Sequence, residues 1–467
     1  MEASHCELLL RIERGEKIEP PGPSIRLGWP RSNDTRRSVV GKSPPPFAKA
    51  GAKNGSELRF VSVSQRDMEM HYSNTEETLD LPMRWSPAVK NVGEQELLQH
   101  FQTSATRALA IMGHTPSKLG DALIRIALAS NTASAGALLK SLLAFSSLHR
   151  HDVHSQAVEL KVDAIKALGV ASGSTHIGKR EAIQHVATGM LLCSFETHQS
   201  TCTSGDWRWY LGSVKQMIEV TGIDKIQNRC DDLAILLDWV YYNDVHDRFA
   251  KQYWHRKLSP RNPPTPPASG VRPPAPIITE NSSPGMVLTH LLSEVIDAIP
   301  AAPPPEAPAG DLQKYNEFIK IIDWRIRSVA ITDQDNDGQG CPLILELYRL
   351  AVLIYLDRAC RTQLHSKAKS QKQVERAFEL IPQVKTCDRQ FSIFIIGCEA
   401  RNDEQRALIL DLIARTERGG SSRVFNHTPL LMQALWAQED LAVGEKTDYN
   451  ERLTSVISVC GIMPTFI

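Results

Sequence analysis

Residues 94–109, EQELLQHFQTSATRAL, carry the pattern that decides the fold. Leu97, Phe101, Ala105 and Leu109 recur every four residues, which places these side chains on one face of a helix. The same spacing returns in segment after segment to the C-terminus, and strand-like alternation is nearly absent. The sequence therefore predicts an all-α fold, a multi-helix domain built from helical hairpins or a bundle.

Further helices follow from the same periodicity. Pro116 is expected to begin one of them, because proline is tolerated in the first turn of a helix. The remaining apolar runs predict helices near 138–148, 160–168, 183–191, 287–298, 319–326, 343–359, 371–386, 390–400, 403–418, 427–442 and 449–461.

Two segments break this pattern. Residues 1–90 hold scattered prolines and charges without a period, and the first 60 residues have a net charge of +4, so we expect a disordered, mildly basic linker. Residues 94–467 are expected to form the helical domain. Within it, residues 259–309 hold 14 of the 28 prolines, which predicts a proline-rich loop on both sides of the short helix at 287–298.

Composition limits the classes of function. The 53 basic and 53 acidic residues balance, which argues against a chain that coats nucleic acid by charge alone. No run of about 18 apolar residues exists, so no transmembrane helix is expected, and the expected partners include no membrane. Nine scattered cysteines without a Cys-x-x-Cys pair, and no signal-peptide core, predict a reduced, intracellular protein.

Aromatic residues gather in residues 207–254, which hold nine of the 29. One interpretation is a pocket for a flat apolar ligand, formed by Trp207, Trp209, Tyr210, Trp239 and Tyr242. The other is that these side chains anchor the packing between helices.

Three motifs partly match known ligand-binding motifs. Residues 173–180 match a phosphate-binding loop except at the last position, and residues 333–344 copy only the start of an EF-hand. His149, His151 and His154 cluster without further ligands at zinc spacing. We interpret the first two as turns between helices and the histidines as a helix end. No nucleophile elbow or other catalytic motif is present, so we expect neither an enzyme nor a cofactor in this chain.

An ordered series of segments resembles the helical regulatory domain of fungal zinc-cluster transcription factors. The series spans roughly residues 94–467 and consists of 138–149 (LLKSLLAFSSLH), 157–168, 189–196 (GMLLCSFE), 207–212 (WRWYLG), 239–244 (WVYYND), 347–356 (LYRLAVLIYL), 394–400 (FIIGCEA) with Asp403 and Arg406, and a terminal helix with Trp436, Gln438 and Asp440. The resemblance implies an all-helical domain in a nuclear transcription regulator, with promoter DNA, a second copy of the chain or co-regulators as partners. Control of a metabolic or secondary-metabolite gene cluster is the family-level expectation.

The chain differs from this family in the zinc cluster itself. It needs six cysteines within roughly 30 residues, whereas Cys6 is the only cysteine before Cys193. We therefore expect no zinc unless an upstream cysteine cluster is restored, and no site-specific DNA binding by this chain alone. Arg36, Arg37 and Lys42 remain candidates for weak phosphate contact or nuclear import, or belong to a solvated linker. The alternative function is an α-helical small-molecule-binding protein or enzyme that uses the aromatic residues at 207–254.

Overall fold

The computed structural model describes residues 92–254 and 282–466, together with residues 273, 275 and 278. Gaps within these ranges fall at 110, 113, 152, 174–176, 200–206, 227–229, 305, 332–341, 361–366, 419–426, 442–447 and 460–463. The predicted linker 1–90, with Arg36, Arg37 and Lys42, lies outside the described residues, as does most of 255–281.

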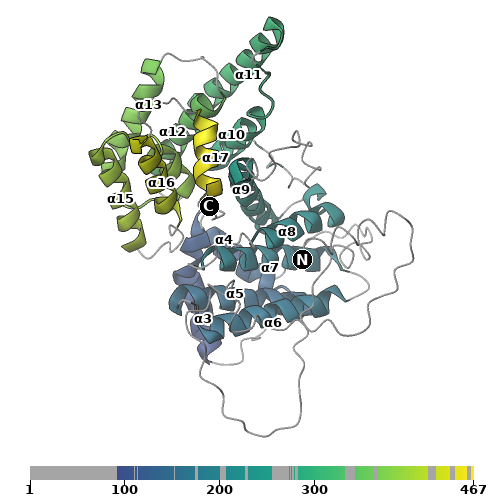
Figure 1. Ribbon diagram of the computed structural model, residues 1–467. Coiled ribbons are helices and arrows are strands. Elements are labelled where there is room, and N and C mark those ends of the chain that lie inside the picture. Colours follow the sequence, from purple (N-terminus) through teal and green to yellow (C-terminus); the bar gives the residue numbers. More distant parts are fainter. Residues whose placement is uncertain are drawn as a thin grey trace, which may run out of the picture. The chain divides into compact units, whose positions relative to one another are not determined.

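Within the described ranges, fifteen α-helices and no strand are present, which confirms the all-α prediction (Figure 1). The α-helices are α3 (Val92–Thr103), α4 (Pro116–Leu128), α5 (Ala133–His151), α6 (Ser155–Ser172), α7 (Lys179–Thr197), α8 (Trp207–Thr221), α9 (Asp231–Trp254), α10 (Pro284–Ala298), α11 (Ala309–Ser328), α12 (Pro342–Ala359), α13 (Lys367–Leu380), α14 (Gln390–Gly397), α15 (Asp403–Arg418), α16 (Thr428–Leu441) and α17 (Tyr449–Val459). None of these helices is both long enough and apolar enough to span a bilayer.

The opening stretch folds as two elements rather than one helix. α3 ends at Thr103, and a 3-10 helix, η1 (Ala105–Leu109), follows it. The break falls at the polar pair Thr103–Ser104, where the Thr103 hydroxyl donates a hydrogen bond back to the Gln99 carbonyl. Hydroxyl side chains compete for backbone partners in this way and weaken a continuous helix. The four apolar side chains of the pattern are nevertheless all buried, as their spacing predicts.

Consecutive helices pair in the first half of the domain. α5 packs on both α6 and α7, and α7 packs on α8. The approach of α7 to α8 is close at Gly189, where a Cβ atom would lie 2.5 Å from Cγ2 of Val214. Val214 is β-branched and stiff, so a glycine is required at this crossing. This explains one residue of the sequence segment 189–196 by packing alone.

Helix α9 connects the two halves. It contacts α4, α7 and α8 on the N-terminal side and α10 and α17 on the C-terminal side. One hydrophobic core runs without interruption from Phe101 to Phe466. The halves on either side of the proline-rich segment therefore share one core.

The short helix inside the proline-rich segment is a member of that core. α10 begins at Pro284, three residues before the predicted start, because Pro284 occupies the first turn after Ser283. Leu288, Leu292 and Val295 of this helix are fully buried. The interruption predicted at 259–309 therefore contains a helix that packs against α9, α11 and α12.

Some predicted boundaries near the C-terminus were wrong. The helix predicted at 371–386 ends at Leu380, because Pro382 lies in the next turn, the 3-10 helix η4 (Ile381–Gln383). The helix predicted at 390–400 ends at Gly397, and Cys398 caps it in a turn. This earlier end places Glu399 at the start of the connection to α15.

Candidate functional site

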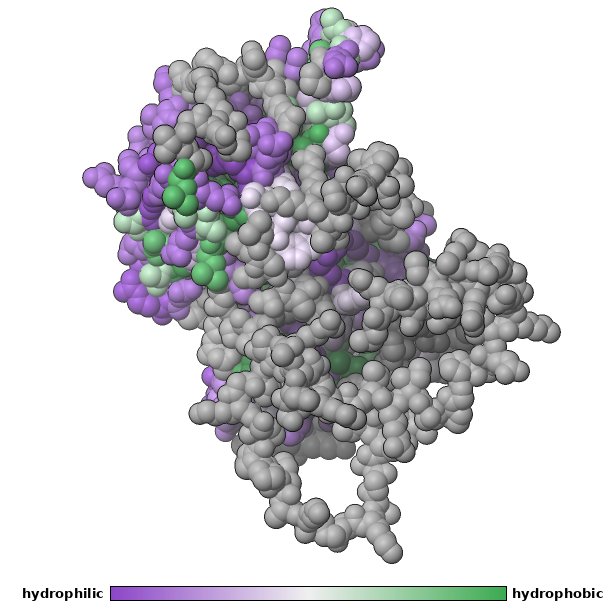
Figure 2. Space-filling model, viewed as in Figure 1, coloured by the Kyte–Doolittle hydropathy of each residue, from purple (hydrophilic) through white to green (hydrophobic). Residues whose placement is uncertain are grey.

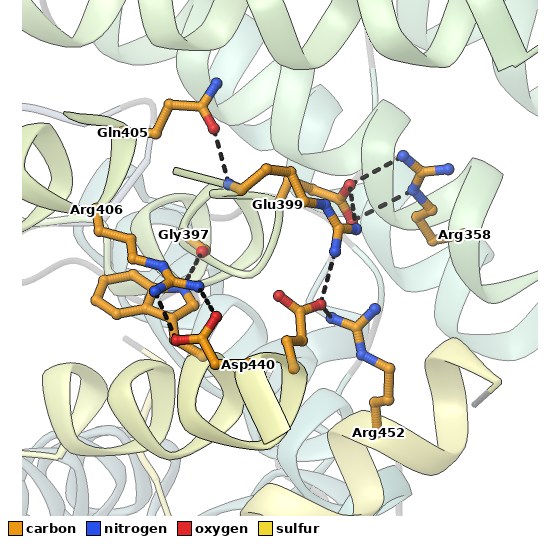
Figure 3. A network of polar contacts seen from close by, with 10 residues as sticks. Arg358, Gly397, Glu399, Gln405, Arg406, Asp440 and Arg452 are labelled. Carbon is orange, nitrogen blue, oxygen red and sulfur yellow. Dashed lines mark hydrogen bonds and ion pairs between the residues drawn. The ribbon is translucent and has the colours of Figure 1, made fainter. Parts of the chain in front are cut away.

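Glu399 is the centre of a polar network that joins α12, α14, α15, α16 and α17 (Figure 3). Its carboxylate is 2% exposed and accepts two hydrogen bonds from Arg358 of α12, from Nε at 3.2 Å and from Nη2 at 2.9 Å. Burial lowers the pKa of Arg358, but the charge of Glu399 and its hydrogen bonds raise that pKa above its usual value overall. The pair is a two-pronged, charge-assisted contact that fixes orientation as well as distance.

Arg401 extends this network to the last two helices. Its guanidinium lies 3.7 Å from Glu399 and 2.8 Å from Oε1 of Glu439 on α16. Glu439 also pairs with Arg452 of α17. Alternating charges therefore run from α12 through the turn after α14 to α16 and α17.

Arg406 of α15 forms the second branch. It donates hydrogen bonds of 2.9 and 2.7 Å to the two carboxylate oxygens of Asp440 on α16, and this contact lowers the pKa of Asp440. Its guanidinium lies 5.5 Å from the ring centre of Trp436, whose indole N–H donates to the Gly397 carbonyl at 2.9 Å. The final carbonyl of α14 is thus satisfied by a side chain of α16.

The network unites residues that the sequence showed only as separate segments. Glu399, Arg406, Trp436 and Asp440 all belong to it, and the exposed Asp403 lies 3.7 Å from Arg406. Sequence reasoning missed its partners, which are Arg358, Arg401, Glu439 and Arg452. Cations face the carboxylates throughout, so the arrangement neutralises the buried charge of Glu399 and joins neighbouring helices.

A second network surrounds Asp244 of α9, the last residue of the WVYYND segment. Asp244 is buried and pairs with Lys215 of α8 at 2.7 Å and with Arg248 at 3.0 Å. Arg248 continues to α10, where it donates to Ser293 at 2.6 Å and pairs with Asp297 at 3.1 Å. This second network ties α8, α9 and α10 together, as the first ties α12 to α17.

The structure divides the five aromatic residues of the proposed pocket. Trp207, Trp239 and Tyr242 are buried in the main core, and Tyr210 is half-buried against it. Trp209 points the other way and is 78% exposed. The first four side chains thus serve packing between α8, α9 and their neighbours, which agrees with the packing interpretation.

A cavity lies away from this aromatic region. It has a volume of about 210 Å³ and lies between the end of α4 and the start of α5, where Ala127, Ser130, Thr132, Gly136 and Leu139 line it. The hydroxyls of Ser130 and Thr132 already hydrogen-bond to Gln184 of α7.

The three motifs that partly match ligand-binding motifs lie in separate parts of the chain. Residues 173–180 follow α6 and end in the first turn of α7, so a helix precedes the motif where a phosphate-binding loop needs a strand. The EF-hand-like residues 333–341 lie outside the described ranges. His149 contacts His100 of α3 at 3.1 Å, and the ring centres of His151 and His154 lie 6.4 Å apart. Among the side chains that the structure describes, no group of three metal-ligating residues comes together.

His246 is a buried titratable group in the centre of the core. Its Nδ1 donates to the Tyr242 carbonyl at 2.8 Å, and its Nε2 lies 3.4 Å from the Tyr348 hydroxyl. Burial is the main cause that lowers the pKa of His246 to about 4; the hydrogen bond to Tyr242 opposes this shift, and the charges of Arg389 and Arg248 add to it. The imidazole is therefore neutral in the folded protein at physiological pH.

We predict that acid weakens the fold partly through His246. The unfolded chain takes up a proton at the usual pKa of about 6.5, before the folded chain does. The contribution of His246 is thus fully present above pH 6.5 and is lost as the pH falls toward 4, by about 2 kcal/mol near pH 5. Denaturant unfolding of His246→Gln, followed from pH 7 to pH 5, should show a correspondingly weaker pH dependence than that of the wild-type chain.

Comparison with known proteins agrees with this architecture. The model of the fungal-specific transcription factor domain matches residues 96–455. "Transcription factor iacI" of Pestalotiopsis fici is 41% identical over 392 residues, which cover 83% of this chain and 99% of that protein. No solved structure matches the chain. The matched range begins in α3, ends in α17 and includes both networks. The chain therefore belongs to the fungal-specific transcription factor domain family, as the resemblance of its sequence segments predicted.

Proposed function

We propose that this chain is a nuclear regulator of transcription that controls the genes of a metabolic or secondary-metabolite cluster. The observation that carries the proposal is the 41% identity to a transcription factor across nearly the whole length of that relative. The central carboxylates of the two networks support it, since Glu399 lies in the segment 394–400 and Asp244 in the segment 239–244, both of which carry the family resemblance. Arg36, Arg37 and Lys42 are the candidate residues for nuclear import.

Contact with promoter DNA is proposed to be indirect for residues 1–467. Specific readout in the major groove needs a rigid element that presents side chains to base edges. In zinc-cluster regulators the cysteine-rich module supplies this element. We propose that a DNA-binding partner, or a zinc cluster encoded upstream, brings the helical domain to the promoter. Zinc is then a cofactor of that element and not of this helical domain.

Deleting the gene in the organism of origin tests the function. The proposal expects coordinated changes in the transcripts of a contiguous group of genes, and restoration by the tagged wild-type chain, which should gather in the nucleus. Arg376→Ala is a suitable control because its ion pair with Glu379 is exposed, so this variant should complement fully. Unchanged transcripts together with a changed metabolite profile would favour the alternative, a ligand-binding protein or enzyme that uses residues 207–254.

A further inference from the structure

Two imidazole rings from different helices meet where α3 packs on α5. Nε2 of His100 on α3 lies 3.1 Å from Nδ1 of His149 on α5, and the ring centres are 5.3 Å apart. The same two helices are joined by the buried hydroxyl of Ser146, which donates to the Leu97 carbonyl at 2.6 Å. A fixed pair of helices therefore presents the two rings to each other.

Solvent reaches this pair of rings. Both side chains are half-buried rather than enclosed. Figure 1 shows α3 and α5 together at the end of the domain away from α11 and α13. In the same view, hydrophilic residues lie along the outer edge of the surface near α3 (Figure 2). A hydrated ion can therefore reach the ring nitrogens and keep part of its water shell.

The distance between the two nitrogens suits a shared metal ion. Imidazole nitrogens bind transition metals at about 2.0–2.1 Å. Two nitrogens that are 3.1 Å apart then enclose an angle of about 98° at the ion. This angle lies between the values of square-planar and tetrahedral coordination, the two geometries common for such ions. The ring that donates in the N–H···N contact needs only to move its proton to its other nitrogen to free both lone pairs.

His100 is available as a ligand at physiological pH. Burial lowers the pKa of His100 below its usual value, and the charges of Arg150 and His151 lower it further. Only the neutral imidazole binds a metal ion, so protons compete weakly for this ring. The positive charge of Arg150 is itself balanced by Glu96, which lies 3.4 Å away.

Glu96 can supply a third ligand. It precedes His100 by four residues on α3, so the two side chains lie on the same face of the helix, one turn apart. The Glu96–Arg150 pair is exposed, at 58% and 40%, and an ion pair in such a position contributes little stability. The carboxylate can therefore leave Arg150 at small cost. Two imidazoles and one glutamate are a recurring ligand set for transition metals.

We propose that His100 and His149 bind one divalent transition-metal ion of the kind that prefers imidazole, such as Ni²⁺ or Cu²⁺, with Glu96 recruited as the third ligand. Water completes the coordination, so the ion exchanges with solvent. The bound ion links α3 to α5 and holds the first helix that the structure describes against the rest of the domain. The two histidines lie 49 residues apart, so sequence spacing did not reveal the pair.

Calorimetric titration of the untagged full chain with Ni²⁺ at pH 7.5 tests the proposal. Nickel is the suitable probe because it favours imidazole, whereas zinc also binds the thiolates of the nine cysteines. The wild-type chain should bind one Ni²⁺ at a site that His100→Gln and His149→Gln each weaken at least about tenfold. His114→Gln is the matched control, since this half-buried histidine contacts Asp238 at 2.8 Å and should not affect the site.

Two charge variants give a readout that a folding defect cannot imitate. Arg150→Gln removes a nearby cation and releases Glu96, so it should strengthen Ni²⁺ binding severalfold, whereas Glu96→Gln should weaken it severalfold. Ni²⁺ should also raise the midpoint of thermal unfolding of the wild-type chain but not of His149→Gln, because only the folded state holds both ligands together.

Equal Ni²⁺ binding by the wild-type chain, His100→Gln and His149→Gln would overturn the proposal and leave the pair as a hydrogen bond between two helices. A loss in Arg150→Gln as large as that in His100→Gln would also overturn it, since the substitutions would then act through the fold. Unchanged affinity in both Arg150→Gln and Glu96→Gln would overturn the part assigned to Glu96.

Discussion

Replacing Glu399 with alanine should lower the free energy of unfolding of the helical domain by about 3 kcal/mol. The change leaves Arg358 beneath the surface without its carboxylate, and it removes the anion that attracts Arg401. Breaking one partner of a buried ion pair costs about 3–5 kcal/mol, and the partial solvent access of Arg358 places the expectation at the lower end. Urea unfolding measures the loss.

Two further variants separate this explanation from a general effect of mutation. Glu399→Gln keeps the shape and some hydrogen bonds, so it should cost less than Glu399→Ala. Glu379→Ala breaks an exposed ion pair with Arg376 and should change the free energy by less than about 0.5 kcal/mol. Hydrogen exchange in Glu399→Ala should speed up first in α16 and α17, because the network attaches these helices. Equal losses in Glu399→Ala and Glu379→Ala would contradict the role assigned to the network.

Replacing Asp244 with alanine should be at least as damaging. Lys215 and Arg248 are both largely buried, and the change leaves Lys215 without the carboxylate of Asp244 and Arg248 with Asp297 as its remaining carboxylate partner. We expect a loss of about 3–5 kcal/mol, measured by the same urea unfolding. The matched control is Asp311→Ala on α11, since Asp311 and its partner Lys314 are exposed and the expected change is close to zero.

A double variant distinguishes whether lost packing or uncompensated charge causes the loss of stability in Asp244→Ala. Lys215→Met in the Asp244→Ala background removes one stranded cation and should recover part of the loss. No recovery would mean that the damage comes from the cavity left by the side chain rather than from uncompensated charge.

Periodicity in the sequence was sufficient to predict the class of fold. Leu97, Phe101, Ala105 and Leu109 are buried as their spacing requires, although the backbone changes from α3 to a 3-10 helix between Phe101 and Ala105. Polar side chains and prolines, rather than apolar spacing, determine where such helices end. The pair Thr103–Ser104 and the later proline at 382 each end a helix that apolar spacing alone would continue.

The polar networks could not be predicted in the same way, because their members are far apart in sequence. Arg358 lies 41 residues from Glu399, and Arg406 lies 34 residues from Asp440. Only tertiary packing brings such charges together, and an amphipathic pattern does not encode the partner of a given charge. One signal was available: Glu399 follows the apolar run FIIGC, where an acidic residue without a partner would be costly to bury.

The role of the aromatic residues at 207–254 could not be predicted from the sequence either. Composition could not distinguish a ligand pocket from packing, and burial of Trp207, Trp239 and Tyr242 in the core supports packing. The exposed aromatic side chain of that set, Trp209, shares its solvent-facing orientation with Trp324 of α11. Sequence spacing did predict a helix from Ile319, Ile322 and Ile326, which are buried, but it did not predict that Trp324 of the same helix is exposed.

The central claim is that this chain regulates transcription through its helical domain. Chromatin immunoprecipitation of the tagged chain, expressed from its own locus, tests that claim most directly. The account predicts enrichment at the promoters of a contiguous group of genes, and loss of this enrichment when Asp244→Ala disrupts the helical domain but not when Asp311→Ala is introduced. A genome-wide profile without promoter enrichment, from a wild-type chain that is expressed and folded, would contradict the account.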